Sequence, residues 1–139
     1  MGTLDSSRSA AGALAALVSL QSLGRQGFRA LLGHAVAMAQ ALFAELRGAP
    51  AIEILNPLNP GPVVLFRALL PGGTNAAETH DRRREVNALN RRLCERLREQ
   101  ARSGDGVLLS MTLDARRAVG DEPLVALKAF VLSPFCTAA

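Results

Sequence analysis

The sequence lacks several residue types that particular classes of protein need. It has 139 residues with no tryptophan and no tyrosine, and its aromatic side chains are five phenylalanines. Proteins that bind single-stranded nucleic acid commonly stack bases on aromatic rings, which this composition hardly supplies. Lys128 is the only lysine, so arginine carries nearly all of the positive charge behind the net charge of +4. The arginines alternate with acidic residues, so we expect a solvated basic face and no nucleic-acid partner.

Cysteine and long apolar runs are also scarce. Cys94 and Cys136 are too few and too far apart for a disulfide framework or a CxxC metal motif, which favours a reducing compartment, the cytoplasm. The longest apolar run, residues 10–20, has about half of the length that a membrane span requires. Asp5 precedes this run and no small-x-small cleavage site follows it. We therefore expect neither a signal peptide nor a membrane partner.

What the sequence does contain is enough apolar material for one domain with a core. Hydrophobic residues make up 49% of the chain and charged residues 20%, which is ordinary for a soluble globular protein. Ser9 is a suitable N-cap for a helix over residues 10–23. The alanines and leucines of this helix leave no wide polar face, so we expect it to be buried on most sides. Such burial requires protein on both sides of the helix.

A second helix is expected after two glycines. Gly24 should end the first helix, and Gly27 should then let the chain turn. Apolar residues recur at helical spacing from there until Gly48 and Pro50 stop the helix. This apolar stripe consists of Phe28, Leu31, Leu32, Ala35, Ala39, Leu42, Phe43 and Leu46.

Four strands are predicted in the remainder of the chain. Their ranges are residues 51–55, 63–68, 107–113 and 124–132. The last of these is apolar on both faces except at Lys128, which indicates a central strand. The proline-rich stretch 56–62 separates the first two, because proline lacks the N–H donor that a ladder or helix needs.

A further helix is predicted at residues 80–102. Its pattern places Val86, Leu89, Leu93 and Leu97 on the inward face, and Asn75-x-x-Glu78 is a possible capping box ahead of it. The predicted fold class is therefore α+β. It consists of two N-terminal helices followed by a small, mainly antiparallel sheet with helices packed to one side.

The strongest site candidate from the residues alone is Ser6-Ser7-Arg8-Ser9. A helix N-terminus offers free N–H groups, and an adjacent guanidinium suits a carboxylate or a phosphate. The competing interpretation is that Ser9 merely caps the helix while Arg8 forms an ordinary surface ion pair. On the residues alone this second interpretation is favoured.

Other reactive residue types lack the spacing that chemistry requires. His34 and His80 have no partner at metal-ligand spacing, so we expect both at the surface and no metal site. Cys94 is expected to be a buried structural thiol, and the run Arg82-Arg83-Arg84 to be solvated. No catalytic motif is present, so we assign no catalytic residue and no cofactor-binding residue.

Several segments are similar, in this order, to motifs of one enzyme family. Residues 3–8 are similar to Thr-Leu-x-Gly-Ser-Arg, with Ser6 in place of glycine. Residues 23–28 are similar to Leu-Gly-x-x-Gly-Tyr, and residues 63–67 to a strand that ends in Phe-Arg. Residues 87–90 match Asn-x-Leu-Asn, and residues 133–137 are close to Asn-Pro-x-x-Thr. Together these segments resemble the carboxy-terminal part of the group II pyridoxal-phosphate-dependent decarboxylases of glutamate and aromatic amino acids, and of the related sphingosine-phosphate lyases.

The resemblance implies a division of the chain into two parts. Residues 1–48 would form a helical segment at the edge of a large domain or at a dimer interface. Residues 49–139 would form the C-terminal small domain of a fold-type I enzyme. Thr3, Ser6, Ser7 and Arg8 would then lie at the active-site mouth or the dimer interface.

The resemblance also implies that the cofactor site lies outside this chain. In this family pyridoxal phosphate is held by a lysine of the large domain, upstream of the segments that match. Lys128 falls in the predicted strand 124–132, where the family has a basic residue of its small-domain sheet. We therefore expect pyridoxal phosphate only in a full-length parent enzyme.

Three hypotheses follow from the sequence. In the first, the chain is the C-terminal fragment of an amino-acid decarboxylase, a lyase of amino-acid metabolism, that is inactive alone and needs its large domain or a second copy as partner. The second is a free-standing α+β dimerisation or docking module without catalysis. The third and weakest is nucleic-acid binding through the predicted helix that carries residues 82–102.

Overall fold

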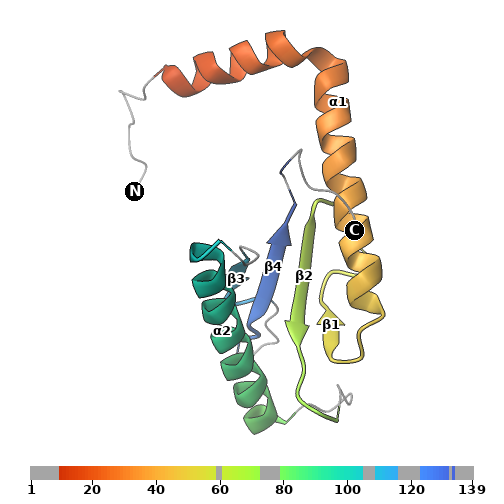
Figure 1. Ribbon diagram of the computed structural model, residues 1–139, viewed down its shortest axis with the longest axis vertical. Coiled ribbons are helices and arrows are strands. Elements are labelled where there is room, and N and C mark those ends of the chain that lie inside the picture. Colours follow the sequence, from red (N-terminus) through yellow and green to blue (C-terminus); the bar gives the residue numbers. More distant parts are fainter. Residues whose placement is uncertain are drawn as a thin grey trace, which may run out of the picture. The chain divides into compact units, whose positions relative to one another are not determined.

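The computed structural model describes residues 10–58, 61–72, 79–104, 109–115, 123–131 and 133. Its elements in chain order are α1 (Ala11–Arg47), β1 (Ile52–Ile54), β2 (Val63–Ala68), α2 (His80–Arg102), β3 (Ser110–Thr112) and β4 (Ala126–Phe130) (Figure 1). The chain forms two compact units, Met1–His34 and Ala35–Ala139. Residues 11–34 of α1 belong to the first unit, and residues 35–47 belong with the sheet.

The strands form one antiparallel four-stranded sheet in the order β1-β2-β4-β3. Glu53 pairs with Arg67 between β1 and β2, and Phe66 pairs with Leu127 between β2 and β4. The predicted α+β class and antiparallel sheet are confirmed, and β4 is central as its apolar pattern predicts. Strand β3 begins at Ser110, since Leu109 is described but is not part of the strand, and residues 105–108 lie outside the described residues.

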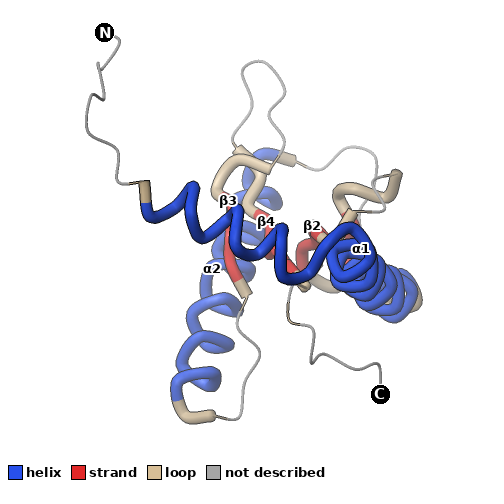
Figure 2. Tube along the Cα trace, turned by 90° about the horizontal axis from the view of Figure 1, so that it is seen from above, coloured by secondary structure: helices blue, strands red, loops and turns tan. Residues whose placement is uncertain are grey.

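The core lies between one face of this sheet and two helical segments, residues 35–47 of α1 and the whole of α2. Figure 2 shows the paths of both helices beside the strands. Strand alternation directs every second side chain to this face, where Val64, Phe66, Leu127 and Ala129 meet Ala39 of α1 and Cys94 of α2. The stripe residues Leu42, Phe43 and Leu46 pack around this cluster. The C-terminal half of the predicted apolar stripe therefore has the role that its spacing indicates.

The opposite face of the sheet carries a smaller apolar cluster. Leu55, Leu124 and Ala126 are buried there, and Leu65 and Ala115 pack against them. Alternation places Leu65 and Ala126 on the face opposite Phe66 and Leu127. Both faces of β2 and β4 are thus partly covered within the chain.

The N-terminal helical region is interrupted at one residue. The sequence predicts that Gly24 ends the first helix, and α1 consists of two helical stretches that meet in a kink at this residue, whose backbone is non-helical (φ 60°, ψ −176°). The turn therefore occurs at Gly24, and the expectation that Gly27 provides it is wrong.

Helix α2 has the predicted bounds, but its buried face is turned about the helix axis. Leu89, Leu93 and Leu97 are only half-buried, while Val86, Asn87, Asn90 and Cys94 are buried. The N-cap is Thr79, whose hydroxyl accepts a hydrogen bond from the Arg82 N–H at 3.3 Å. The possible capping box at Asn75 and Glu78 lies outside the described residues.

Candidate functional site

The four residues predicted at the active-site mouth, Thr3, Ser6, Ser7 and Arg8, lie outside the described residues. Their placement stays a prediction, as does the cap at Ser9. The structure instead defines the surfaces and contacts of the segments that follow them.

The segment 11–23 of α1 exposes large apolar side chains. Its exposed members are Leu14 (61% exposed), Leu17 (50%), Val18 (52%), Leu20 (57%) and Leu23 (43%). No charged residue occurs from Ser9 to Gly24. The expected burial on most sides is therefore not provided by the residues described. Contiguous apolar surface of this kind marks a binding interface in soluble proteins.

Gly24 and Gly27 together build the corner that follows this segment. The φ and ψ of Gly24 lie in a region that is essentially restricted to glycine. A Cβ on Gly27 would lie 2.9 Å from the Leu23 Cβ, closer than real contacts allow. Gly24 thus permits the turn, and Gly27 gives Leu23 the room to pack across it.

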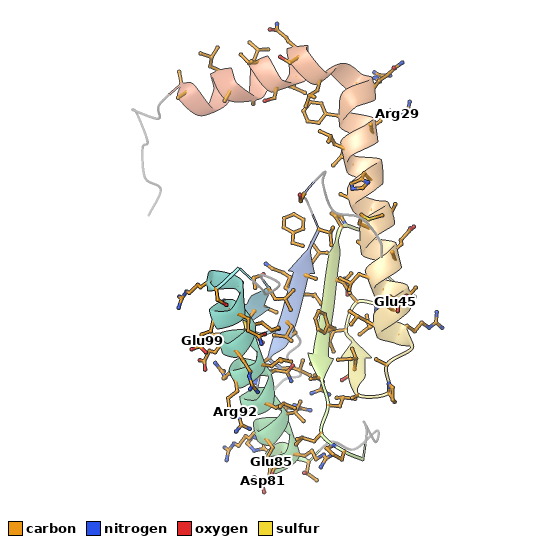
Figure 3. All side chains as sticks on the ribbon, in the orientation of Figure 1. Arg29, Glu45, Asp81, Glu85, Arg92 and Glu99 are labelled. Atoms are coloured by element: carbon orange, nitrogen blue, oxygen red, sulfur yellow. The ribbon has the colours of Figure 1, made fainter. Side chains whose placement is uncertain are left out.

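By length and composition alone, α1 is the one helix among the described residues that could cross a membrane. This is weak evidence, since core helices and signal sequences pass the same test. The corner at Gly24 divides the helix, and residues 11–23 reach only about 20 Å at 1.5 Å per residue. A bilayer core is about 30 Å thick. The second half carries charged side chains, among them Arg29 and Glu45 (Figure 3), so neither half suits a straight span.

Two buried asparagines of α2 bind the main chain of the sheet. The Asn90 side chain is 0% exposed, and its Oδ1 accepts from the Ala68 N–H at 2.8 Å while its Nδ2 donates to the Ala68 carbonyl at 2.9 Å. Nδ2 also donates to the Val86 carbonyl at 2.8 Å. All hydrogen-bonding groups of this amide but one lone pair are therefore used.

Asn87 makes the equivalent contacts with the segment that leads into β4. Its Oδ1 accepts from the Val125 N–H at 2.9 Å, and its Nδ2 donates to the Pro123 carbonyl at 2.9 Å. The register places Ala68 and Val125 just beyond Phe66 and Leu127, the last paired residues of β2 and β4. Both amides thus satisfy main-chain groups at the point where the two strands stop pairing.

Sequence pattern alone did not identify these two asparagines as the residues that attach α2 to the main chain of the sheet. A buried main-chain group left without a partner costs about 1–3 kcal/mol, which explains why α2 presents amides and not leucines here. The available signal was the Asn-x-Leu-Asn segment, which the resemblance to the decarboxylases had already singled out.

Two arginines are engaged within the small domain. Arg67 is 3% exposed and forms an ion pair with Glu53, its direct neighbour on β1. Arg82 donates through Nη2 to the carbonyl oxygens of Leu70 and Pro71, so it holds the segment after β2. The expectation that the run Arg82-Arg83-Arg84 is merely solvated is therefore wrong for Arg82.

Lys128 does not have the surroundings of a cofactor lysine. It lies half-buried in the middle of β4, paired with Leu65 on one side and Ser110 on the other. The Ser110 hydroxyl donates to the Lys128 carbonyl at 3.3 Å. The described residues therefore do not fit a pyridoxal-phosphate site, which needs a lysine that reaches into a cleft.

The remaining reactive residues have mostly structural surroundings. Cys94 is 0% exposed with its Sγ 4.0 Å from the Leu109 carbonyl oxygen, which confirms the predicted buried thiol. His80 is exposed as expected, but His34 is half-buried, and its Nε2 has no hydrogen-bond partner among the described residues. No group of three His, Cys, Asp or Glu side chains in the described ranges is arranged to hold a metal ion.

A shallow hollow of about 360 Å³ lies beside the edge strand β1. Its walls are Phe43 and Arg47 of α1, Ile52 and Ile54 of β1, and Pro57 and Leu58 of the following loop. Every lining residue belongs to the Ala35–Ala139 unit. The residues that line the hollow are apolar except for Arg47, while its exposed surface combines polar atoms, including main-chain groups and the guanidinium, with apolar ones.

Solved structures similar to this chain include those of pyridoxal-phosphate-dependent amino-acid decarboxylases of group II. The chain resembles these enzymes in structure, which confirms the resemblance that its sequence motifs indicate. No protein-family model matches the sequence, and no curated protein matches it.

Three of the similar structures are decarboxylases from a bacterium and two plants. The Oryza sativa TDC structure with PLP and tryptamine is 25% identical with a TM-score of 0.59, over 84% of this chain and 21% of that chain. The Catharanthus roseus tryptophan decarboxylase in complex with L-tryptophan is 24% identical with a TM-score of 0.58, over 86% and 20%.

The third is the glutamate decarboxylase domain of diaminobutyrate-pyruvate transaminase and L-2,4-diaminobutyrate decarboxylase from Vibrio parahaemolyticus. It is 23% identical with a TM-score of 0.56, over 90% of this chain and 22% of that chain. At identities below 25%, the Catharanthus and Vibrio structures show a likeness of fold alone. The chain spans only about a fifth of the length of all three proteins.

Proposed function

We propose that this chain is the C-terminal portion of a pyridoxal-phosphate-dependent amino-acid decarboxylase, a carboxy-lyase, and that it is inactive alone. The observation that carries the proposal is the unequal coverage, 84–90% of this chain against 20–22% of the similar chains. Lys128, its only lysine, is unsuited to hold the cofactor. The parent enzyme would supply the Schiff-base lysine, the cofactor and the amino-acid pocket from its large domain.

In this proposal residues 1–48 form a helical segment at the large-domain edge or dimer interface, and residues 49–139 form the small domain. The exposed leucines of segment 11–23 support such a place, because they need a covering that the described chain does not provide. Thr3, Ser6, Ser7 and Arg8 would lie at the active-site mouth or the dimer interface. We further propose a cytoplasmic homodimer for the parent enzyme.

The first test adds pyridoxal phosphate to the full chain and follows imine absorbance before and after borohydride reduction. We expect no stable adduct on Lys128, and the Lys128→Arg variant should give the same spectrum as the wild type. A reduced adduct mapped to Lys128 by mass spectrometry would overturn the proposal that the chain is inactive alone.

The second test concerns the parent enzyme. The DNA upstream of this chain is sequenced, and the joined protein is assayed for carbon dioxide release from amino acids. We expect a frame that encodes a lysine-bearing cofactor domain, and activity that depends on it. An upstream region without such a domain would contradict the proposal.

The alternative function is a free-standing α+β dimerisation or docking module. The observation that favours it is the separate core of the Ala35–Ala139 unit, which buries Leu127 and Cys94 completely. A module of this kind would show a cooperative melt and a defined oligomer in ultracentrifugation. The fragment proposal expects aggregation through the exposed leucines instead.

A further inference from the structure

The edge strand β1 offers main-chain groups to a further strand. Hydrogen bonds from the Leu55 N–H to Leu65 and from the Leu69 N–H to Ala51 fix which residues of β1 face β2. In an antiparallel ladder the alternate residues, Ile52 and Ile54, direct their N–H and C=O groups away from the partner strand. The Ile52 N–H donates to the Ala49 carbonyl, whereas the N–H and C=O of Ile54 have no hydrogen-bond partner among the described residues. An extended segment could bond to them.

The hollow beside this edge is suited to one apolar side chain and one carboxylate. Phe43, Ile52, Ile54, Pro57 and Leu58 provide apolar walls, and Arg47 supplies the charge. No ion pair of Arg47 occurs within the described ranges. A volume of about 360 Å³ holds a side chain the size of leucine or phenylalanine together with a terminal carboxylate.

Asn56, the residue that precedes Pro57 and Leu58 at the rim of the hollow, is attached to β2. The Asn56 Nδ2 donates to the Val63 carbonyl at 2.8 Å, and its Oδ1 accepts from the Leu65 N–H at 2.8 Å. Asn56 thereby holds the start of the loop against β2, directly before Pro57 and Leu58. Leu58 is nevertheless 95% exposed, the most exposed large apolar side chain described. The hollow is thus built on ordered contacts but presents uncovered apolar surface.

We propose that this hollow and the β1 edge bind the C-terminal segment of another protein, which adds to the sheet as an extended strand. Its last side chain would be apolar and would enter the hollow, and its terminal carboxylate would pair with Arg47. Outward main-chain groups, an apolar wall and an unpaired cation are the three elements that such recognition combines. The site lies wholly within the Ala35–Ala139 unit, so it goes beyond the proposed function and does not depend on it.

The test measures fluorescence anisotropy of a labelled peptide, Gly-Ser-Val-Ile-Val with a free carboxylate, titrated with the full chain fused to a soluble carrier protein. We expect saturable binding, and at least tenfold weaker binding of the same peptide as its carboxamide. Arg47→Gln should weaken the carboxylate peptide about tenfold and leave the carboxamide unchanged, as expected for loss of one charge-assisted hydrogen bond.

Two further variants complete the experiment. Arg92→Gln removes an exposed positive charge on α2 (Figure 3), outside the hollow, and should bind like the wild type. Ile54→Pro removes the outward N–H at an edge position where proline breaks no bond to β2, so binding should fall although the circular dichroism spectrum is kept. The proposal would be overturned if the carboxylate and carboxamide peptides bound with equal affinity. It would also be overturned if neither peptide showed saturable binding.

Discussion

The two compact units differ in what covers their apolar side chains. In the Ala35–Ala139 unit, Leu127, Val125 and Cys94 are 0% exposed because two helices and a sheet meet around them. In the described part of the Met1–His34 unit, Leu14 and Leu20 are more than half exposed, although they are leucines like the fully buried Leu127. Residue type therefore does not decide burial here. The second unit buries its apolar side chains within itself, whereas the described residues of the first unit leave theirs exposed.

Because of this difference, truncating a leucine should lower the free energy of unfolding much more in the second unit than in the first. Leu127→Ala leaves a cavity in the core, and we expect a loss of about 2–5 kcal/mol in the free energy of unfolding. The matched variant is Leu17→Ala, at a 50% exposed position of the first unit, with an expected change within about 0.5 kcal/mol. Urea denaturation followed by circular dichroism measures both. Similar losses would show that segment 11–23 packs within the chain after all.

Polar contacts of the second unit can be tested in the same way. Asn90→Ala removes the hydrogen-bond partners of the N–H and C=O of half-buried Ala68, and we expect a loss of about 1–3 kcal/mol in the free energy of unfolding. Arg92→Ala, on the exposed side of α2, is the control and should change little. If both variants had the same urea midpoint, the asparagine contacts would not stabilise the small domain.

A substitution at Gly24, the corner of α1 in the first unit, should affect stability less than the preceding variants and should mainly change the geometry of the helix. Gly24→Ala strains the observed φ and ψ by about 1–3 kcal/mol, so α1 should straighten. Spin labels at positions 14 and 31 would then approach the separation of about 25 Å expected for a straight helix over this range. Gly33→Ala is the matched control, since no heavy atom lies within 4 Å of its added Cβ. If the distance between the two labels were unchanged in Gly24→Ala, the conclusion that Gly24 produces the corner in α1 would be contradicted.

The smallest change in stability is expected where the exposed leucines become polar. Leu14→Gln combined with Leu17→Gln should alter the unfolding free energy by less than about 1 kcal/mol, because neither side chain is buried. Light scattering of the isolated chain should nevertheless fall, because the apolar surface is reduced. Unchanged scattering would indicate that this surface does not drive association.

The sequence predicts much of the second unit because its local signals agree with its packing. Pro62 and the apolar run after it set the start of β2, and the helical pattern at 80–102 gives the bounds of α2. The apolar pattern around Lys128 also places β4 centrally. Each of these features depends on neighbouring residues, which a sequence displays directly.

The features that sequence pattern missed depend on contacts between distant residues. Asn87 and Asn90 are buried because the ladder between β2 and β4 stops at Phe66 and Leu127, which no local pattern reveals. By residue type Gly24 and Gly27 are equally suited to a turn, so the sequence does not reveal that the turn lies at Gly24 and that Gly27 instead gives Leu23 room to pack. The site residues Thr3, Ser6, Ser7 and Arg8 stay predictions.

The paired amides of α2 have a mechanical consequence. One turn of a single helix holds Ala68 at the end of β2 and Val125 at the entry to β4, so sliding these strands past each other would strain both attachments. The sheet and α2 should therefore move together as one rigid body when a force acts on either of them.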